Sequence, residues 1–293
     1  MNIVLLFGGY TERDVSIMSA KEVESSLKRL GHKVTKIDIS KENFCHYSEN
    51  NIDLIFNSLH GGIGENGVIQ SVCELKSIPY TGSAVLASAI AMNKVLAKKV
   101  FNSMNINTAN SLVSNINDIK KNEPMERPYV IKPIDGGSSL GVNIIKKDSN
   151  LDILELSNKN ILVETYVAGK EIAVAIIENH ILGMIEIKHD EIFYDYKSKY
   201  KSSGTKYVIP KNIGAYQKEL LESFSLSAHK ILGCKGVTRA DFIVPDEPSI
   251  QPVLLEINTL PGLTKHSLVP KIAQNNGINF DDLISMIIKD ALI

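Results

Sequence analysis

The sequence predicts a chain that begins with a small α/β domain and continues as a mostly antiparallel α+β region. Two observations support this fold class. Apolar strand-like runs alternate with helical patterns over residues 1–92, whereas several strand-like runs follow one another directly after residue 127. The chain has 293 residues, enough for two or three structural units of roughly 100 residues each.

The first segments read as a βαβ unit followed by a further strand. "NIVLLF" is a buried strand, "GGYTERDVSIMSAKEVESSLKRLGH" a glycine turn and a helix that ends at Gly31, and "KVTKIDI" the next strand. "NIDLIFNSLH" adds another strand and "VIQSVCELKSI" a helix. "PYTGSAVLASAIAMNKVLAKKVFNSM" is expected to form a turn and one longer helix. Residues 1–92 are therefore predicted to be a doubly wound domain.

The remaining chain divides at a change of pattern. "RPYVIKP", "GVNIIKK", "NILVETYV" and "EIAVAIIENHILGMIEIK" are strand-like runs separated by glycine or polar turns. After the polar stretch "DYKSKYKSSGTKYVIP" come a helix, "AYQKELLESFSLSAHKILG", a hairpin, and a final amphipathic helix near "FDDLISMIIKDAL". We expect a central unit over residues 93–168 and a C-terminal unit over residues 169–293.

Composition excludes several classes of protein. Lys and Arg number 32 against 33 Asp and Glu, a formal net charge of -1, so no basic excess points to nucleic acid. The three cysteines, Cys45, Cys73 and Cys234, suit neither a disulfide framework nor a zinc site and are expected to be reduced. No run approaches the roughly 18 apolar residues of a membrane span, and the N-terminal run is a poor signal peptide. A cytoplasmic enzyme without a membrane partner is expected.

Polar residues share one face of each strand in the predicted hairpin "TRADFIVPDEPSIQPVLLEIN". At a period of two, Arg239 and Asp241 lie on one face of the first strand, and Glu256 and Asn258 on one face of the second. The residues expected on the opposite faces are Ala240, Phe242, Leu255 and Ile257.

This hairpin is the most specific chemical signal in the chain. Asp241, Glu256 and Asn258 supply three hard oxygen ligands, which suit Mg²⁺, with Mn²⁺ as an alternative. A magnesium ion held in this way usually also binds substrate phosphates. The alternative is a solvated hairpin face, but the flanking runs "FIV" and "VLL" are too apolar for a freely exposed edge.

A glycine-rich turn follows Lys132 in "YVIKPIDGGSSLGVNIIK". Its backbone N–H groups and the hydroxyls of Ser138 and Ser139 could close over phosphates. It is not a Walker A loop, because Val142 and Asn143 stand where Lys and Ser or Thr are required. The strand-like run that follows predicts a hairpin lid, with an ordinary glycine-rich β-turn as the alternative.

Other candidates keep two readings. "GIGENG" has the glycine spacing of a dinucleotide site but lacks the acidic residue about 20 positions on, so a nicotinamide dehydrogenase is disfavoured. His60 and Glu12 follow strands at a carboxyl edge, where ligands bind, although each could be structural, Glu12 as an acid in the first turn of a helix.

Glu164 and Glu171 flank a strand-to-strand crossing that could bind adenine and ribose or be a solvated loop. The loop "YDYKSKY" carries groups that could bind phosphates or cap a site, namely Tyr194, Tyr196, Lys199 and Tyr200. The alternative is a charged surface loop.

Taken together, these segments resemble the D-alanine:D-alanine ligases of the ATP-grasp superfamily over nearly the whole chain. The most specific segments are "HGGIGENGVIQ", "IPYTGS", "KPIDGGSSLGV", "DYKSKY" and "LEINTLPGLTKHSLVP". The resemblance implies an ATP-grasp fold: an N-terminal doubly wound domain, a central lid domain and a C-terminal catalytic domain. It also implies a homodimer that uses ATP to phosphorylate one D-alanine, after which a second D-alanine attacks the acyl phosphate for cell-wall synthesis.

The resemblance assigns a role to each candidate residue. Nucleotide binding falls to Lys94, Lys132 and Ser139 at the phosphates, Glu164 and the backbone near Val167 at adenine, and Glu171 at ribose. The metal ligands are Asp241, Glu256 and Asn258. At the first D-alanine the resemblance places Glu12, together with Ser138 and Tyr200, and also His60. It places Lys199 at the transferring phosphate, and Arg239 and the Gly262 N–H as stabilisers of the oxyanion. Ser267 and Leu268 would bind the carboxylate of the second D-alanine.

Two departures and two rival readings accompany the resemblance. Asn93 replaces the Asp common in the family's "M-D-K" element, and the turn before Glu12 is one residue shorter than usual. Tyr200 resembles the dipeptide-forming members rather than those that make D-alanyl-D-lactate. Another ATP-grasp carboxylate-amine ligase is the nearest rival. A regulatory nucleotide-binding protein with a degenerate site is disfavoured, because the metal ligands and both lysines are present.

Overall fold

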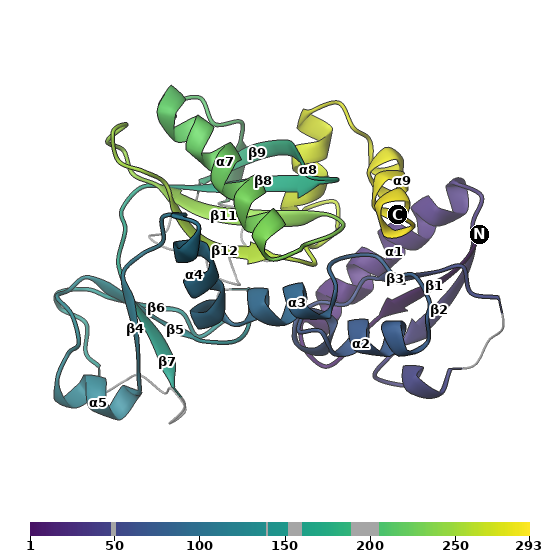
Figure 1. Ribbon diagram of the computed structural model, residues 1–293, viewed down its shortest axis with the longest axis horizontal. Coiled ribbons are helices and arrows are strands. Elements are labelled where there is room, and N and C mark those ends of the chain that lie inside the picture. The colour runs from purple at the N-terminus through teal and green to yellow at the C-terminus, as the bar shows by residue number, and fades with distance from the viewer. Residues whose placement is uncertain (48–50, 139, 152–159, 189–204) are drawn as a thin grey trace.

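The computed structural model describes residues 1–47, 51–138, 140–151, 160–188 and 205–293. Its strands form three sheets, of three, four and five strands in the order of the chain. In Figure 1 the three-stranded and four-stranded sheets lie at opposite ends of the molecule, with the five-stranded sheet between and above them. All three cysteines are free, as expected. No helix in this part of the chain has the length and apolar character that a bilayer crossing requires.

The first sheet is parallel and confirms the predicted βαβ unit. Its order is β2 (Lys33–Asp38), β1 (Asn2–Phe7), β3 (Leu54–Asn57), and α1 (Arg13–Arg29) connects β1 to β2. Alternate residues of β1 enter two different apolar cores, with Ile3 on one side and Val4 on the other. Both faces are therefore covered, as is usual for parallel sheets. The 3₁₀ turns Phe44–His46 and Gly62–Gly64 and helix α2 (Val68–Leu75) complete this part.

The single longer helix expected after residue 84 is wrong, because the chain forms two helices there. Helix α3 (Val85–Met92) ends and α4 (Lys94–Ser103) begins at Asn93, which has extended dihedral angles. The Asn93 side chain accepts a hydrogen bond of 3.0 Å from the backbone N–H of Leu96 and so caps α4. Asparagine and aspartate cap helices about equally well, so the replacement at this position keeps the cap.

The second sheet is antiparallel, with the order β4 (Ser111–Ser114), β7 (Ile161–Thr165), β5 (Tyr129–Pro133), β6 (Asn143–Ile145). The hairpin of β5 and β6 around the glycine-rich turn was expected, whereas β4 and helix α5 (Ile116–Lys121) were not.

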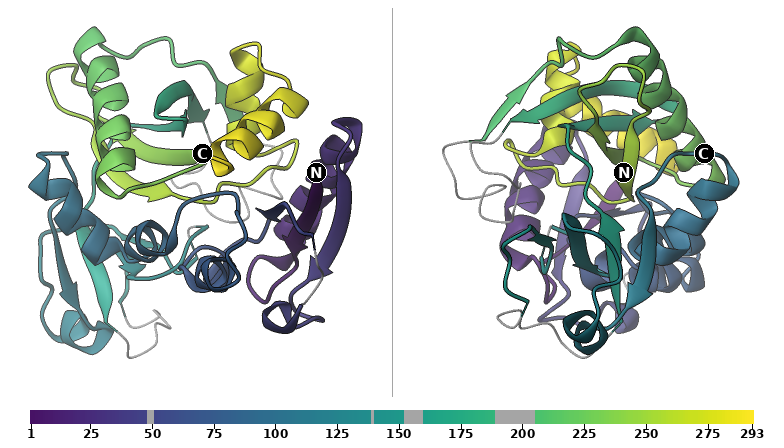
Figure 2. Two further views of the ribbon diagram at one scale, coloured as in Figure 1. Left: turned by 45° about the vertical axis from the view of Figure 1, so that its right-hand side comes forward. Right: turned by 90° about the vertical axis from the view of Figure 1, so that its left-hand side faces the viewer.

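The third sheet has the order β10 (Lys206–Val208), β9 (His180–Lys188), β8 (Lys170–Ile177), β11 (Thr238–Val244), β12 (Val253–Asn258) and is antiparallel throughout. Its two faces are covered by different helices. Alternate residues of β8 contact the core that includes α7 (Ala215–Ile231) and the core that includes α8 (Leu268–Asn275) and α9 (Phe280–Ala291). Figure 2 shows α7 on one side of this sheet and α8 and α9 on the other.

The end of the chain returns to its beginning. Helix α9 packs against α1, and both contribute to one apolar core with β1 and β8. The Asp281 carboxylate accepts two hydrogen bonds from Arg29, at 2.6 and 2.8 Å, and one from Ser26. The first and third sheets therefore share one apolar core, and hydrogen bonds between α1 and α9 join them on that side.

Candidate active site

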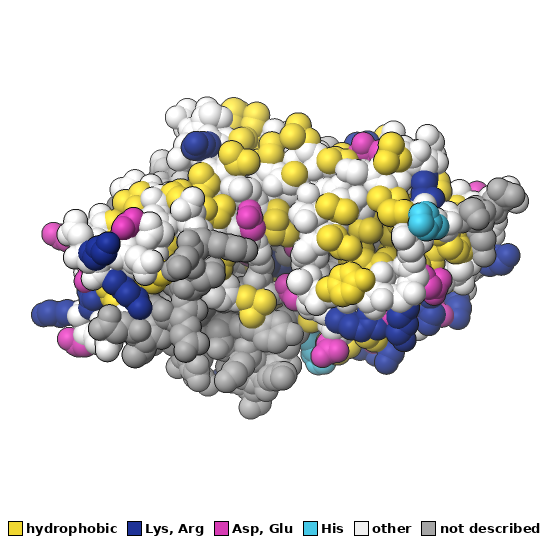
Figure 3. Space-filling model, turned by 90° about the horizontal axis from the view of Figure 1, so that it is seen from below, with side chains coloured by type: hydrophobic (Ala, Val, Ile, Leu, Met, Phe, Trp, Pro, Cys, Tyr) yellow, Lys and Arg dark blue, Asp and Glu magenta, His cyan; other side chains and the backbone are white. Residues whose placement is uncertain are grey.

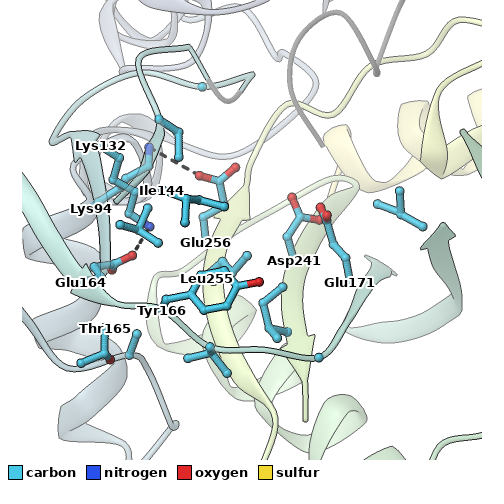
Figure 4. A pocket seen from close by; sticks show the side chains of 18 of the residues that line it. Lys94, Lys132, Ile144, Glu164, Thr165, Tyr166, Glu171, Asp241, Leu255 and Glu256 are labelled. Atoms are coloured by element: carbon cyan, nitrogen blue, oxygen red, sulfur yellow. Dashed lines mark ion pairs between the residues drawn. The ribbon is translucent and has the colours of Figure 1, made fainter. Parts of the chain in front are cut away.

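A cavity of about 570 Å³ lies between the second and third sheets (Figure 4). Volumes of this order are typical of sites for small molecules and cofactors. Charged side chains from α4, β5, β7, β8, β9, β11 and β12 line it, among them Lys94, Lys132, Glu164, Glu171, Asp241 and Glu256. Val167, in the link between β7 and β8, also lines it.

The hairpin places its four polar side chains on one face, as predicted. Arg239 pairs with Asn258 and Asp241 with Glu256 in the antiparallel register, so each pair shares a face of the sheet. Ala240, Phe242 and Ile257 lie in the apolar core on the other side. Because alternation directs every second residue outward, a buried core and a polar cavity wall can come from the same two strands.

Leu255 does not follow that alternation, and the expectation for it is wrong. The register shifts between Asp241 and Phe242, because Phe242 pairs with Leu254 and leaves Leu255 as an extra residue on β12. A bulge of this kind rotates the strand locally. Leu254 therefore enters the core, while Leu255 lines the cavity beside Glu256 (Figure 4).

The Asp241 carboxylate is held in place by Arg239. The Nε atom of Arg239 lies 2.7 Å from Oδ1 of Asp241, and Nη2 lies 2.8 Å from Oδ2. Both side chains are only 11% exposed. A two-pronged contact of this kind fixes the orientation of both groups, so Asp241 is directed along the cavity wall and Arg239 towards the neighbouring small pocket.

A buried cluster of three charges lies on the opposite side of the cavity, where Glu164 and Lys132 line it. The Glu164 carboxylate lies 2.5 Å from Nζ of Lys132 and 2.5 Å from Nζ of Lys98. Burial alone would raise the pKa of Glu164, but the two lysines outweigh it and hold that pKa below its usual value. Lys98 was missed from the sequence, although it lies one helical turn after Lys94 and therefore on the same face of α4.

Lys94 links the glycine-rich turn to the hairpin. Its Nζ atom donates a hydrogen bond of 2.5 Å to the carbonyl oxygen of Gly136 and lies 3.4 Å from Oε2 of Glu256. The backbone N–H of Lys94 also donates to the carbonyl oxygen of Ile134. The start of α4 is thus fixed to the turn that would cover bound phosphates.

Glu12, which lies between β1 and α1, contacts the same turn. It precedes α1 with a left-handed φ of 46°, and its side chain makes no capping hydrogen bond to that helix. Its Oε2 atom instead accepts a hydrogen bond of 2.5 Å from the hydroxyl of Ser138, which also has a positive φ, 53°. Non-glycine residues in this conformation cost of order 1 kcal/mol each, and such strain concentrates at functional sites.

A second pocket, of about 60 Å³, adjoins the large cavity and shares Gly137 and Glu256 with it. Nine sequence-predicted residues line it: Glu12, His60, Ser138, Arg239, Glu256, Asn258, Gly262, Ser267 and Leu268. Glu65, Tyr207 and His266 also line it.

His60 and Glu65 are neighbours in the small pocket, and both have shifted pKa values. Burial lowers the pKa of His60 to about 4 and raises the pKa of Glu65 to about 7. The Nδ1 atom of His60 lies 3.9 Å from Oε1 of Glu65, but the imidazole is uncharged at neutral pH, so this contact is not an ion pair there. The Nε2 atom of His60 lies 3.1 Å from the Ser19 hydroxyl. Glu65 was missed from the sequence, within "GENG".

The start of α8 closes the small pocket. Ser267 occupies the N-cap position and Leu268 the first turn, so the free N–H groups of this helix end favour a carboxylate. A side chain at Gly262 would place its Cβ 2.8 Å from Oγ of Ser267 and 3.6 Å from Cε1 of His60. A side chain at this position would therefore displace the Ser267 hydroxyl from the pocket wall.

Several predicted residues lie outside the described part of the chain. Ser139, Lys199 and Tyr200 belong to this group, as do Tyr194 and Tyr196. The hydrogen bond between Glu12 and Ser138 is present, whereas the expected contribution of Tyr200 to that group stays a prediction.

Family models match most of the chain. The model described as "D-ala D-ala ligase C-terminus" matches residues 94–289, and "D-ala D-ala ligase N-terminus" matches residues 42–83. The chain belongs to the D-alanine–D-alanine ligase family. A D-alanine–D-alanine ligase of a Chelativorans species is 41% identical over 99% of this chain and 97% of its own length. That of Rickettsia typhi is 41% identical over 99% of this chain and 92% of its own.

Solved ligase structures share the fold. D-alanine–D-alanine ligase from Bacillus anthracis superposes with a TM-score of 0.81 at 32% identity, over 100% of this chain and 97% of that one. The same enzyme complexed with ATP gives 0.81 at 31%. The VanG D-Ala:D-Ser ligase from Enterococcus faecalis gives 0.82 at 25%, over 99% of this chain and 100% of that one. The ATP-grasp architecture inferred from the sequence is thereby confirmed.

Proposed function

We propose that this chain joins two D-alanine molecules to D-alanyl-D-alanine at the expense of ATP, supplying a precursor for peptidoglycan. The observation that carries this proposal is the junction of the two pockets at Glu256 and Gly137. A large cavity for a nucleotide opens directly into a small one that suits amino acids, within a chain of the D-alanine–D-alanine ligase family.

The large cavity takes ATP. Lys94 and Lys132 supply positive charge for the phosphates, and the glycine-rich turn lies next to both. Glu164, Val167 and Glu171 line the same cavity and are the candidates for the adenine and ribose contacts. The complex of the Bacillus anthracis ligase with ATP supports a nucleotide site in this fold.

The hairpin residues fit a divalent cation shared with the nucleotide. Within the described residues, no three carboxylate, imidazole or thiolate groups gather as a metal site of their own. Asp241 and Glu256 nevertheless face each other in register on the cavity wall, and Asn258 follows on the same face. Mg²⁺ prefers one or two carboxylates and completes its shell with phosphate oxygens and water, so this donor set suits it, or Mn²⁺. When bound, the cation would neutralise charge on the phosphates.

Glu12 binds the first D-alanine. The Glu12 carboxylate lines the small pocket and is a candidate partner for the substrate ammonium group, and the Ser138 hydroxyl fixes its orientation. A carboxylate oxygen of D-alanine then attacks the γ-phosphorus of ATP, and the bond to the bridging oxygen breaks to leave ADP and D-alanyl phosphate. Phosphoryl transfer depends chiefly on positioning and charge neutralisation, which the lysines provide.

The start of α8 binds the carboxylate of the second D-alanine. Its amine, after losing a proton, attacks the carbonyl carbon of D-alanyl phosphate, and the tetrahedral intermediate expels inorganic phosphate as the peptide bond forms. Arg239 and the backbone N–H of Gly262 line the small pocket and are the candidates to stabilise the oxyanion. Lys199, Tyr200 and Ser139 keep their predicted roles at the phosphates and at the Glu12 group.

D-serine is a second candidate for the attacking amine. The structural match to a D-Ala:D-Ser ligase favours keeping it, because serine is larger than alanine by only a hydroxyl group. Pockets discriminate weakly against so small an addition unless they are built against it.

We also propose a cytoplasmic homodimer with units at residues 1–92, 93–168 and 169–293. Exposed apolar side chains on α2 and α3 support dimerisation, since Leu75 is 87% and Leu86 69% exposed. Figure 3 views the molecule from below, and apolar side chains are spread over the described part of that face. Light scattering of the wild type and of Leu86→Glu tests this: a dimer that becomes a monomer supports the proposal, and a wild-type monomer refutes it.

The function is tested by phosphate release from ATP and Mg²⁺ with D-alanine, with products identified by mass. L-alanine, D-alanine plus D-lactate, and D-alanine plus D-serine serve as comparisons. Release that requires D-alanine and yields its dipeptide is the expected result. ATP binding without release would direct the search to other carboxylate and amine pairs.

A further inference from the structure

Lys98 lies behind the wall of the large cavity rather than in it. Its Nζ atom donates hydrogen bonds to Oε1 of Glu164, at 2.5 Å, and to the carbonyl oxygen of Ala109, at 2.7 Å. Glu164 and Ala109 both line the cavity, whereas Lys98 does not. The Lys98 side chain is 6% exposed, so it reaches bound ligands only through these two neighbours.

The two oxygens of Glu164 are divided between two lysines. Oε1 faces Lys98 on helix α4, and Oε2 faces Lys132 on strand β5. Val130 pairs with Glu164 across β5 and β7, which places Lys132 two residues further along on the same face of the sheet. Lys132 therefore lies on the cavity side of the carboxylate, and Lys98 on the helix side.

The net charge of this cluster determines what the cavity offers to an anion. Glu164 and Lys132 alone would form a neutral pair, and a lysine that is fully compensated attracts phosphate weakly. Burial lowers the pKa of Lys98, but the adjoining Glu164 carboxylate opposes that shift and favours the charged lysine. With Lys98 included, two positive charges face one negative charge. The lysines hold the pKa of Glu164 low despite its burial, so the carboxylate remains ionised at neutral pH. The cluster therefore presents one positive charge in excess.

We propose that Lys98 is a positioning residue that neutralises Glu164 from behind the cavity wall and thereby leaves the charge of Lys132 available to the phosphates of the nucleotide. This inference rests on the proposed nucleotide site. It explains why the chain buries a lysine that touches no cavity space, an arrangement that is stable only while every member of the cluster is present.

The test separates the phosphate contribution from the base contribution to binding. Dissociation constants of ADP and adenosine are measured by calorimetry in the presence of Mg²⁺, and the ratio of the adenosine constant to the ADP constant reports what the phosphates add. The variants are Lys98→Met, Glu164→Gln and the double variant. Lys99→Met is the matched control, since Lys99 is the next residue of α4 and is exposed. Thermal unfolding establishes that each variant is folded.

Lys98→Met is expected to lower the ratio about tenfold, because Lys132 then forms a neutral pair with Glu164. The double variant restores the ratio to at least its wild-type value, since it lacks the carboxylate as well, and Glu164→Gln alone keeps or raises it. Such non-additivity is the signature of coupled charges. If Lys98→Met does not fold, Glu164→Gln and the double variant still test the proposal. A fall in the ratio of the adenosine constant to the ADP constant in either variant refutes it.

Other results overturn the inference directly. An unchanged ratio in Lys98→Met, an equal fall in Lys99→Met, or a parallel loss of ADP and adenosine affinity would show that Lys98 only maintains the shape of the base pocket. Failure of the wild type to bind ADP at all would refute the proposed nucleotide site, and so is distinguishable from failure of this inference.

Discussion

The Ser138 hydroxyl lies 2.5 Å from the Glu12 carboxylate, although 126 residues separate them in the chain. Ser138 belongs to the glycine-rich turn between β5 and β6, and Glu12 follows the first strand of the parallel sheet. The contact therefore joins a turn of the second sheet to the segment that follows β1 of the first sheet, beside the small pocket that both residues line. It orients the one carboxylate that we assign to the substrate ammonium group.

Ser138→Ala removes this hydrogen bond and leaves Glu12 free to rotate. Because hydrogen bonds to charged groups contribute about 1.5–3 kcal/mol, we expect KM for D-alanine to rise roughly ten- to a hundredfold. The KM for ATP should change much less. Steady-state kinetics with each substrate varied separately measures both, and Ser25→Ala on the exposed face of α1 is the control. An unchanged KM for D-alanine would show that Glu12 acts without Ser138.

Glu256→Gln removes a carboxylate at the junction of the two pockets. The amide keeps the shape of the side chain but loses the charge that would bind the cation, so turnover should fall about a hundredfold or more. The thermal midpoint should hardly change, because Glu256 lies on the cavity wall and not in the core. Glu219→Gln, on the exposed side of α7, should keep full turnover. An active Glu256 variant would refute the metal assignment.

Glu65 makes the stability of the fold depend on pH. Its pKa rises from an ordinary 4.5 to about 7 in the folded protein, so its contribution is complete below pH 4.5 and is lost as the pH rises through 7. The loss is at most about 3 kcal/mol, reduced because the side chain is 13% exposed. Glu65→Gln should therefore stabilise the protein at pH 9 and not at pH 4.5. Urea unfolding at both pH values measures the free energy of unfolding of the wild type and of Glu65→Gln. The same pH dependence of that free energy in the two proteins would contradict the prediction.

Tyr207 lines the small pocket, and the centroid of its ring lies 3.6 Å from Nζ of Lys271 on α8. We expect this side chain to limit the size of the pocket. Tyr207→Val should enlarge the pocket and raise the preference for D-serine or D-valine over D-alanine as the second substrate, by about tenfold. Competition between the amino acids, with dipeptides quantified by mass, measures the preference. Tyr207→Phe keeps the ring and should keep the preference; equal product ratios in all three proteins would exclude Tyr207 from specificity.

Local periodicity was sufficient to predict the parts of the fold that depend on it. The βαβ unit and the β11–β12 hairpin follow from runs whose apolar residues repeat at the period of one element, and both are present. The orientation of Leu255 was predicted wrongly, because a bulge inserts one extra residue into β12 and no glycine in the sequence marks it. Helices α3 and α4 were merged because Asn93 ends one and caps the next while the apolar pattern continues.

The parts of the candidate site that come from a single sequence motif could be predicted. The parts that depend on contacts made only in the folded chain could not. The four polar residues of the hairpin share a face by alternation alone. Lys98 and Glu65 gave little sign of their burial, because charged residues in a helix or loop are usually solvated. Lys98 is compensated by Glu164, which is far from it in the sequence, whereas the raised pKa of Glu65 comes from its burial in the folded chain.

The most direct test of the account follows one oxygen atom. D-alanine labelled with ¹⁸O in its carboxylate is incubated with the protein, ATP and Mg²⁺, and the released phosphate is analysed by mass. Attack of the carboxylate on the γ-phosphorus, followed by expulsion of phosphate by the second amine, transfers one ¹⁸O atom to each phosphate. We predict one labelled oxygen per phosphate released. Dipeptide formation with unlabelled phosphate would contradict the acyl-phosphate route and the arrangement of the two pockets on which it depends.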